Sequence, residues 1–559
     1  MNRNVESHFA LNPTRLDMSR SKFDRSFSLK TSFNVGDIVP FYVDEVLPGD
    51  TFDVKTSKVV RMQTLITPIM DNIYLDTYYF FVPNRLVWEH WKQFNGENTE
   101  SAWLPSTEYS IPQLTAPSGG WSVGTIADYM GIPTGVANLS VSALPFRAYA
   151  LICNEWFRDE NLCDPLVVPT GDATVAGSNK VASVEDYAKG ATPYKAAKYH
   201  DYFTSCLPAP QKGPDVMIGL SGEANVFGNG YTLGWTNGTL TGGSRSGSAL
   251  GDQNTKVGTL LSGSTTSGST NEMPGGDGKL WGIVQKSQIS DPAYSGLVAD
   301  LSTATSATIN QLRLAFQIQK LYEKDARGGT RYTEILKTHF GVTSPDSRLQ
   351  RPEYLGGNRV PININQVVQN SATVEGETPL GNVAGYSVTS DTHSDFRQSF
   401  TEHGFVIGVM VARYDHTYQQ GIERFWSRKT RFDYYWPVLA NIGEQAVLNK
   451  EIYAQGTSED DEVFGYQEAW GDYRYKPNRV TGEMRSRYAQ SLDVWHLGDD
   501  YTKLPSLSSE WIVEDKTNVD RVLAVTSMNA NQLFADLYIN NQTTRPMPMY
   551  SIPGLVDHH

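Results

Sequence analysis

Cysteine is scarce in this sequence: its 559 residues include only Cys153, Cys163 and Cys206. An odd number of cysteines without metal-ligand spacing argues against a disulfide framework and is typical of a chain that folds in a reducing cytoplasm. Long apolar runs are missing as well, and the longest one (residues 405–412) is far shorter than the roughly 20 residues of a membrane-spanning helix. The first thirty residues contain no apolar run of a secretory signal. We therefore expect neither membrane insertion nor secretion.

Positive charge is in deficit. The chain has 47 Lys and Arg against 61 Asp and Glu, which gives a formal net charge of −14. Such a balance argues against a surface made mainly for binding nucleic acid. If the chain does enclose a nucleic acid, a small basic partner or bound cations must neutralise most of the phosphates.

Catalytic motifs are absent too. The sequence has no His-Glu-x-x-His, no phosphate-binding Gly-Lys-Ser/Thr loop and no Gly-x-Ser-x-Gly elbow. His393 and His403 lie near several acidic residues, and residues 459–462 are all acidic, but both patterns are more often ordinary polar surface than a metal site. We predict no catalytic residue, no cofactor and no metal site, and hence no enzyme.

Aromatic and turn-forming residues are abundant, with 29 Tyr, 22 Phe and 12 Trp beside 48 Gly and 28 Pro. This composition favours short strands joined by long loops. Alternating or doubly apolar segments predict strands at residues 37–43, 54–64, 72–82, 402–414 and 519–526. Helical spacing predicts helices at residues 144–161, 306–324 and 331–340.

The predicted strands lie at both ends of the chain, with helices and loops between them. Strands so far apart share a sheet only through Greek-key connections with large insertions, an arrangement that a jelly roll provides. We expect one mainly β domain over residues 31–559, preceded by a mildly basic arm over residues 1–30. The proline-spaced residues 541–559 suit an extended C-terminal arm.

One segment differs in composition from the rest of the chain. Residues 219–278 contain 16 Gly and 17 Ser or Thr, which is too little apolar material for a separate core. The segment still includes Phe227, Tyr231, Trp235 and Arg245. We interpret it as a long surface insertion, with a merely flexible loop as the alternative.

Two segments combine cations with aromatic residues, at residues 424–436 and 473–488. This combination is typical of single-stranded nucleic-acid binding, because cations follow phosphates while rings stack on unpaired bases. Arginine and aromatic residues are also the preferred residues of protein interfaces, so subunit contact or core packing is favoured for these segments and DNA contact is the alternative. The candidate single-stranded DNA contacts are Arg424, Trp426, Arg428, Lys429, Arg431, Arg474, Lys476 and Arg479.

Several blocks make the sequence resemble a known family. They are residues 78–88 (YYFFVPNRLVW), 144–149 (LPFRAY), 154–159 (NEWFRD), 201–205 (DYFTS), 210–214 (PQKGP), 351–357 (RPEYLGG), 443–451 (GEQAVLNKE), 473–477 (YRYKP) and 492–496 (LDVWH). With these blocks the chain closely resembles the major capsid proteins of gokushoviruses, a branch of the Microviridae related to the microvirus capsid protein F. The blocks extend almost from end to end of the chain.

The resemblance implies an eight-stranded antiparallel jelly roll of the viral capsid type. It implies that sixty copies assemble through pentamers into a T=1 icosahedral shell around circular single-stranded DNA. Implied partners are an internal scaffolding protein, a small basic DNA-binding protein and a pilot protein, with assembly in the bacterial cytoplasm. Residues 219–278 fall where the family has a protrusion at the threefold axis.

From this position we expect the insertion to contact a host-surface receptor, with Phe227, Tyr231, Trp235 and Arg245 as candidates. The alternative from another class is a secreted jelly-roll lectin or glycoside hydrolase.

Overall fold

The computed structural model describes residues 19–99, 107–216, 309–371 and 380–550, together with the backbone of five short strands between residues 217 and 308. The chain divides into two compact units. One unit comprises Met1–Lys212 and Glu323–His559, and the other is Gly213–Tyr322. Within the described residues, no helix is long and apolar enough to cross a membrane.

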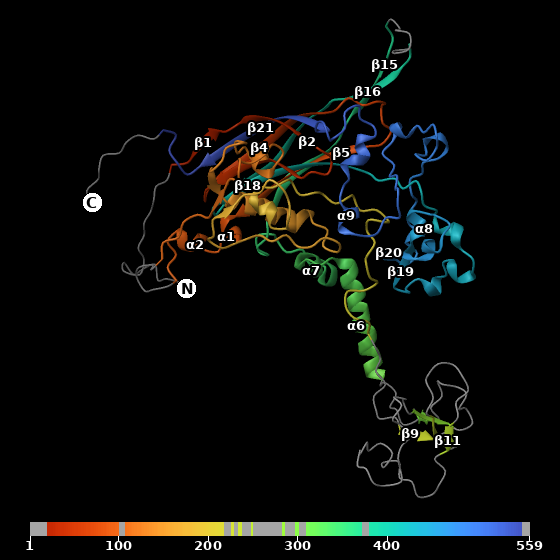
Figure 1. The fold of residues 1–559 in the computed structure, drawn as a ribbon. Helices are drawn as coiled ribbons and strands as arrows, with labels where there is room; N and C mark the ends of the chain where they lie inside the picture. Colours follow the sequence, from red (N-terminus) through yellow and green to blue (C-terminus); the bar gives the residue numbers. More distant parts are fainter. Residues whose placement is uncertain are drawn as a thin grey trace, which may run out of the picture. The chain divides into compact units, whose positions relative to one another are not determined.

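The first unit contains two large antiparallel sheets (Figure 1). In sheet one, β21 lies between β4 and two N-terminal strands that pair with successive parts of it. The strands are β1 (Ser21–Asp24), β2 (Phe27–Phe33), β21 (Leu533–Arg545), β4 (Thr51–Met62) and β17 (Thr389–Ser399), in the order β2-β21-β4-β17 with β1 extending β2 along β21.

Sheet two contains the two most apolar strands of the chain at its centre. Its order is β14 (Glu353–Pro361), β5 (Ile73–Pro83), β18 (Gly404–Tyr414) and β3 (Val39–Val46). The pairing of β5 with β18 is continuous and places Phe80 opposite Ile407. Strands more than 300 residues apart in sequence are thus neighbours in both sheets.

The main hydrophobic core lies between the two sheets. Sheet one contributes alternate residues of β4 and β21, such as Phe52, Val60 and Leu537, and sheet two contributes Tyr79 and Met410. Alternation follows from the strand period of two, since every second side chain of a strand points to the same face.

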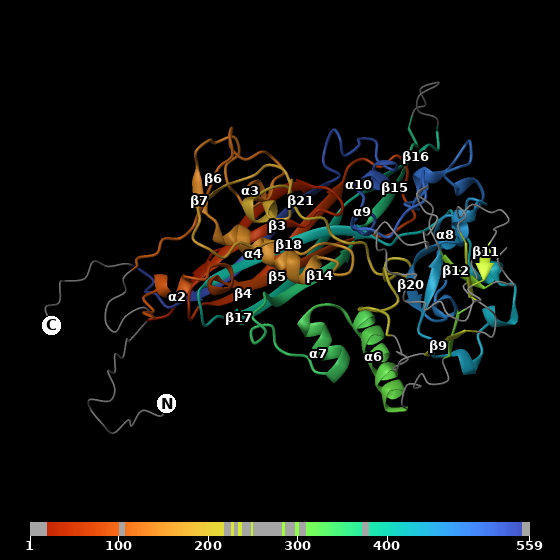
Figure 2. The same cartoon turned by 60° about the horizontal axis from the view of Figure 1, so that its bottom comes forward.

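The outer face of sheet two is also covered. Phe80 and Ile407 belong to a second core that includes α4 (Leu144–Ile152) and Trp88, which follows α1 (Asn84–Val87). Figure 2 shows α4 beside β18 and β5. The predicted helix over residues 144–161 is confirmed in its first half and continues as the π-helical turn η1 (Cys153–Phe157). This cover explains why residues 72–82 and 402–414 are apolar on both faces.

The predicted strands at residues 37–43, 54–64, 72–82 and 402–414 correspond to β3, β4, β5 and β18. The helices predicted at residues 306–324 and 331–340 correspond to α6 (Ile309–Gly328) and α7 (Tyr332–Phe340). The strand predicted at residues 519–526 is wrong. Asp515 accepts a hydrogen bond from the backbone of Thr517 and starts the helix α10 (Lys516–Asp520). Val519, Val522 and Leu523 join the main core, and the segment has no strand pairing beyond an isolated bridge of Leu523 to Leu65.

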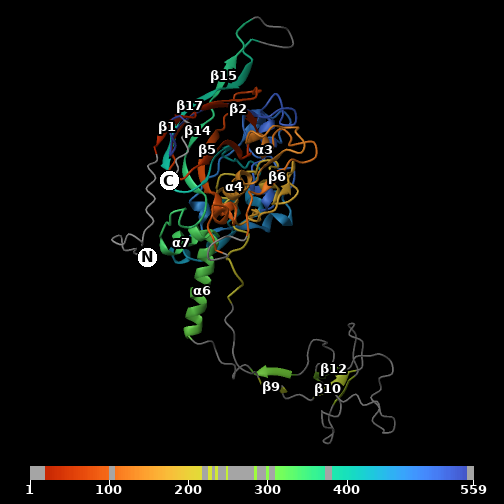
Figure 3. The ribbon, with the colours of Figure 1, turned by 90° about the vertical axis from the view of Figure 1, so that its left-hand side faces the viewer.

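The ends of the first unit are partly strand. Sheet one includes residues of both predicted arms, since β1 and β2 begin before residue 31 and β21 ends at Arg545. Residues 1–18 and 551–559 lie outside the described residues. The hairpin of β15 (Ile364–Val368) and β16 (Val383–Ser387) extends beyond the sheets in both Figure 1 and Figure 3.

A third, smaller core lies after β18 and positions the candidate site. It includes Phe203, Tyr418 and Phe464 and joins the β19–β20 hairpin to residues 202–206. Its elements are β19 (Glu444–Leu448), α8 (Asn449–Ile452), β20 (Val463–Glu468) and α9 (Ser509–Ile512). The other short α-helices and strands of the first unit are α2 (Trp91–Phe94), α3 (Ile126–Tyr129), β6 (Gln113–Thr115), β7 (Ser140–Ser142) and β8 (Val175–Ala176).

The second unit contains the predicted insertion over residues 219–278. The backbone of β9 (Asn225–Gly228) pairs antiparallel with that of β13 (Leu297–Asp300). β10 (Leu233–Thr236) pairs with both β11 (Gly247–Ala249) and β12 (Gly282–Gln285). Strand pairing in this unit therefore extends past residue 278.

Candidate nucleic-acid interface

The two cation- and aromatic-rich segments lie side by side in the structure. Both line one open cavity of about 680 Å³, here called the cleft. Six of the eight candidate DNA contacts line it: Arg424, Trp426, Arg428, Arg474, Lys476 and Arg479. Lys429 and Arg431 do not line it but are exposed on the same segment. Sequence spacing alone could not predict this meeting, because about 40 residues separate the two segments.

Tight backbone packing fixes the first segment. A Cβ added to Gly421 would lie 1.9 Å from the carbonyl oxygen of Glu451, so only glycine allows this approach. The amide of Ile422 then donates to the carbonyl of Lys450 at 2.9 Å. The short turn η5 (Arg424–Ser427) follows after Glu423, and its first three residues line the cleft.

Carboxylates hold most of the cleft cations. Arg424 contacts Glu451 at 2.9 Å, and Arg428, whose side chain is 8% exposed, pairs with Asp472. Glu423 pairs with Lys476 and Arg479 together, and Arg474 pairs with Glu468. These acidic partners were missed from the sequence. The available signal was that Glu423 and Asp472 directly precede Arg424 and Tyr473.

The cleft is nevertheless more basic than the chain as a whole. Its lining has six Lys or Arg side chains against three carboxylates, Glu423, Glu451 and Asp472. Burial raises the pKa of Glu451 above its ordinary value, against the opposing effect of the Arg424 charge.

Aromatic rings form the other half of the surface. Trp426 is 72% exposed and its ring lies tilted against that of Phe425, with ring centroids 4.7 Å apart. The guanidinium of Arg428 lies 4.3 Å from the ring centroid of Tyr473. Further exposed rings on the two segments are Phe432, Tyr434, Tyr435, Trp436 and Tyr488. So many exposed rings need a partner, because water solvates them poorly.

The candidate receptor contacts are separate from this cleft in sequence. Phe227 lies in β9 and Trp235 in β10. Tyr231 and Arg245 lie outside the described residues, and so do the side chains of Phe227 and Trp235.

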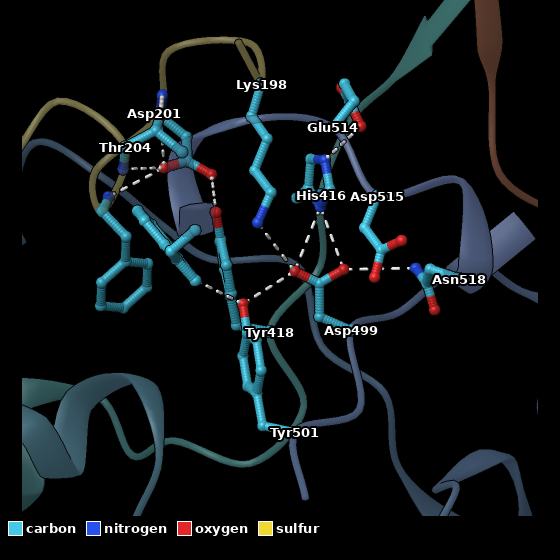
Figure 4. A network of polar contacts seen from close by, with 12 residues as sticks. Lys198, Asp201, Thr204, His416, Tyr418, Asp499, Tyr501, Glu514, Asp515 and Asn518 are labelled. Carbon is cyan, nitrogen blue, oxygen red and sulfur yellow. Dashed lines mark hydrogen bonds and ion pairs between the residues drawn. The ribbon is translucent and has the colours of Figure 1, made fainter. Parts of the chain in front are cut away.

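A buried polar network lies beside another cavity, of about 360 Å³ (Figure 4). His416 contacts Asp499 through Nδ1 and Glu514 through Nε2, each at 3.0 Å. Two carboxylates outweigh burial and raise the pKa of His416 to about 9, while the imidazolium holds that of Asp499 near 2 despite burial. Tyr501 donates to Asp499 at 2.9 Å. The ion pairs of His416 with Asp499 and Glu514 connect three segments of the chain, so we interpret the network as structural.

The residues weighed as a metal site do not gather. His393 contacts Asp395 at 3.1 Å, whereas the ring of His403 packs against Trp91. In the acidic run, Asp461 pairs with Lys450. The part of the chain that the structure describes contains no group of three or more His, Cys, Asp or Glu able to hold a metal ion.

Comparison with known proteins agrees with the resemblance seen in the sequence. Residues 14–555 match the family model described as "Capsid protein (F protein)". The chain is 44% identical to "Capsid protein VP1" of Bdellovibrio phage phiMH2K over 99% of its length and 98% of that protein. It is 44% identical to the protein of the same name from Spiroplasma virus 4, over 96% of this chain and 95% of that protein. It is 43% identical to the one from Chlamydia phage 1, over 99% of this chain and 98% of that protein.

Proposed function

Since this chain belongs to the phage F capsid protein family, we propose that sixty copies assemble through pentamers into a T=1 icosahedral shell around circular single-stranded DNA. The chain is a structural capsid protein of the virion, and the predicted resemblance to gokushovirus capsid proteins is confirmed. The similar proteins favour this function over the secreted lectin or glycoside hydrolase. A closed shell built from one chain needs several different contact surfaces, which long loops and terminal arms supply.

The two large sheets are proposed to be the halves of an eight-stranded jelly roll. Support comes from the strand orders β2-β21-β4-β17 and β3-β18-β5-β14. Numbered one to eight in chain order, the eight strands give the orders 1-8-3-6 and 2-7-4-5, which is the jelly-roll pattern of two interlocked Greek keys. The remaining segments are then insertions between these strands.

The cleft is proposed to bind the packaged single-stranded DNA. The observation that carries this is the meeting of two separate cation- and aromatic-rich segments at one open, net basic cavity in a net acidic chain. The ion pairs keep the cations in place, and phosphates would compete with Glu423 for Lys476 and Arg479. Trp426 would stack on a base, a contact worth about 1–3 kcal/mol.

Binding of a labelled single-stranded oligonucleotide to purified subunits, measured over a range of salt concentrations, tests the cleft. Trp426→Ala should weaken binding with little change in salt dependence. Lys476→Ala combined with Arg479→Ala, which removes two cations of the cleft lining, should weaken binding and lower the salt slope by about 1.4, or about 0.7 for each phosphate that is no longer neutralised. Glu423→Gln should strengthen binding, because it releases Lys476 and Arg479.

Matched controls lie far from the cleft in sequence. Lys30→Ala removes an exposed cation from sheet one, and Phe340→Ala removes a 73% exposed ring from α7. Neither should change oligonucleotide binding. If the cleft variants bind DNA normally but associate more weakly with one another in sedimentation, the cleft is a subunit interface and the DNA proposal is wrong.

The insertion over residues 219–278 is proposed to form the threefold protrusion and to contact a host-surface receptor. Its Gly-, Ser- and Thr-rich composition and the separate unit around it support a surface role. Deletion of residues 222–276 should give particles that assemble but attach poorly to host cells. Normal adsorption by such particles would contradict the receptor role.

The shell is proposed to assemble in the bacterial cytoplasm with a scaffolding protein, a small basic DNA-binding protein and a pilot protein. The net charge of −14 supports the basic partner, because the chain alone cannot neutralise a packaged genome. Reconstitution with and without a basic peptide should show higher DNA content in its presence.

A further inference from the structure

Lys58 occupies a position where a lysine is unexpected. It lies in the row of β4 residues that face the main core, between Thr56 and Val60, and its side chain is only 1% exposed. Its Nζ has one carboxylate contact, 3.1 Å from Oδ2 of Asp391, and no hydrogen bond of good geometry among the described residues. A buried ammonium is costly unless it is fully paired and hydrogen-bonded.

An amide lies at the same carboxylate. Nδ2 of Asn358 donates to Oδ2 of Asp391 at 2.8 Å, so the lysine amine and the asparagine amide contact one oxygen atom. Asp391 is the cross-strand partner of Lys58 on β17, whereas Asn358 lies in β14 of the other sheet. The two sheets come very close here, since a Cβ on Gly356 would lie 2.2 Å from the carbonyl oxygen of Asp395.

From this arrangement we propose that Lys58 and Asn358 form an intramolecular isopeptide bond, promoted by Asp391. A buried amine, an amide and a carboxyl group whose side chain is 25% exposed meet where the two sheets approach each other. They are the reactants and the acid–base catalyst of amide exchange. The bond would join β4 to β14 and so link the two sheets covalently.

The reaction balances without a cofactor. The Lys58 ammonium first passes a proton to Asp391, which leaves a neutral amine able to act as the nucleophile. Nζ attacks Cγ of Asn358, and the new Nζ–Cγ bond replaces the Cγ–Nδ2 bond. The Asp391 carboxylic acid gives its proton to the leaving Nδ2 and then takes the proton that the attacking amine loses. Ammonia departs, Asp391 ends protonated and no redox change occurs.

Intact-mass spectrometry of the purified full-length chain under denaturing conditions tests the proposal. The chain should weigh about 17 Da less than its sequence, the mass of one ammonia. A tryptic digest should contain a branched peptide that joins the segments around Lys58 and Asn358. The full mass in chains that show a folded β-sheet circular-dichroism spectrum would overturn the proposal.

Variants separate the bond from other losses of ammonia. Lys58→Met and Asp391→Asn should both restore the full mass, whereas Lys55→Met, an exposed lysine on the same strand, should keep the loss. A loss that persists in Lys58→Met would come from succinimide formation at an asparagine and would also overturn the proposal. The wild-type measurement decides the question even if a variant fails to fold.

Discussion

The buried imidazole of His416 makes a strong prediction about the pH dependence of subunit stability. His416 is held between Asp499 and Glu514, and Lys198 approaches Asp499 at 3.9 Å (Figure 4). Replacement by glutamine removes the cationic form and leaves two buried carboxylates facing a neutral side chain. Removing one partner of a buried ion pair typically costs about 3–5 kcal/mol.

The magnitude follows from proton linkage. The pKa of His416 rises from 6.5 to about 9 in the folded chain, and a 2.5-unit difference corresponds to about 3 kcal/mol. Because the folded pKa is raised, this stability is fully present below pH 6.5 and is lost as the pH rises through about 9. The lowered pKa of Asp499, near 2, belongs to the same ion pair, so its contribution is not added.

Urea unfolding of purified subunits measures the effect. Between about pH 6 and about pH 9, the free energy of unfolding of the wild type should fall by about 3 kcal/mol more than that of His416→Gln. The variant has no imidazole at this position and so does not bind the proton. The control His90→Gln removes a more exposed imidazole with one carboxylate partner, Asp172, and should follow the wild-type slope much more closely. Equal slopes for wild type and His416→Gln would refute the reasoning.

Two further substitutions test the packing of sheet two. Tyr149→Phe should destabilise the subunit by about 1–3 kcal/mol in denaturant unfolding, because the buried hydroxyl donates to the carbonyl of Ile38 at 2.6 Å and accepts from the amide of Tyr194. Gly357→Ala should give poorly folded, protease-sensitive subunits, because its Cβ would lie 2.0 Å from the carbonyl oxygen of Thr77. A protease-resistant Gly357→Ala subunit would show that β14 can move away from β5.

The sequence was sufficient to predict the strands whose apolar character is strong. β5 and β18 are apolar on both faces because α4 covers the side that the main core does not. β14 and β17 were missed because they are edge strands with mixed polar residues, and edge strands need little apolar pattern. β21 has regularly alternating buried and exposed residues, but it was not predicted. It follows a long insertion, and its partner strands near the N-terminus are some 500 residues away in sequence.

The same limit applies to the cleft. Its cations and rings were predictable by residue type, because both segments are compositionally unusual. The pairing of Glu423 with Lys476 and Arg479 was not, because those partners lie more than 50 residues away in sequence. Lys58 likewise looks like an ordinary surface lysine in sequence, and only the register of β4 shows that it faces the core.

The position of β21 also constrains when the subunit can fold. This strand follows all other described strands in the sequence and lies between β2 and β4, so these two strands have no common partner until Leu533–Arg545 has been made. Contacts that close such long loops form slowly and late. Sheet one, and the core that it shares with sheet two, must therefore be completed after synthesis. A chain that ends before Leu533 therefore lacks the strand that joins β2 to β4 and has no complete sheet one.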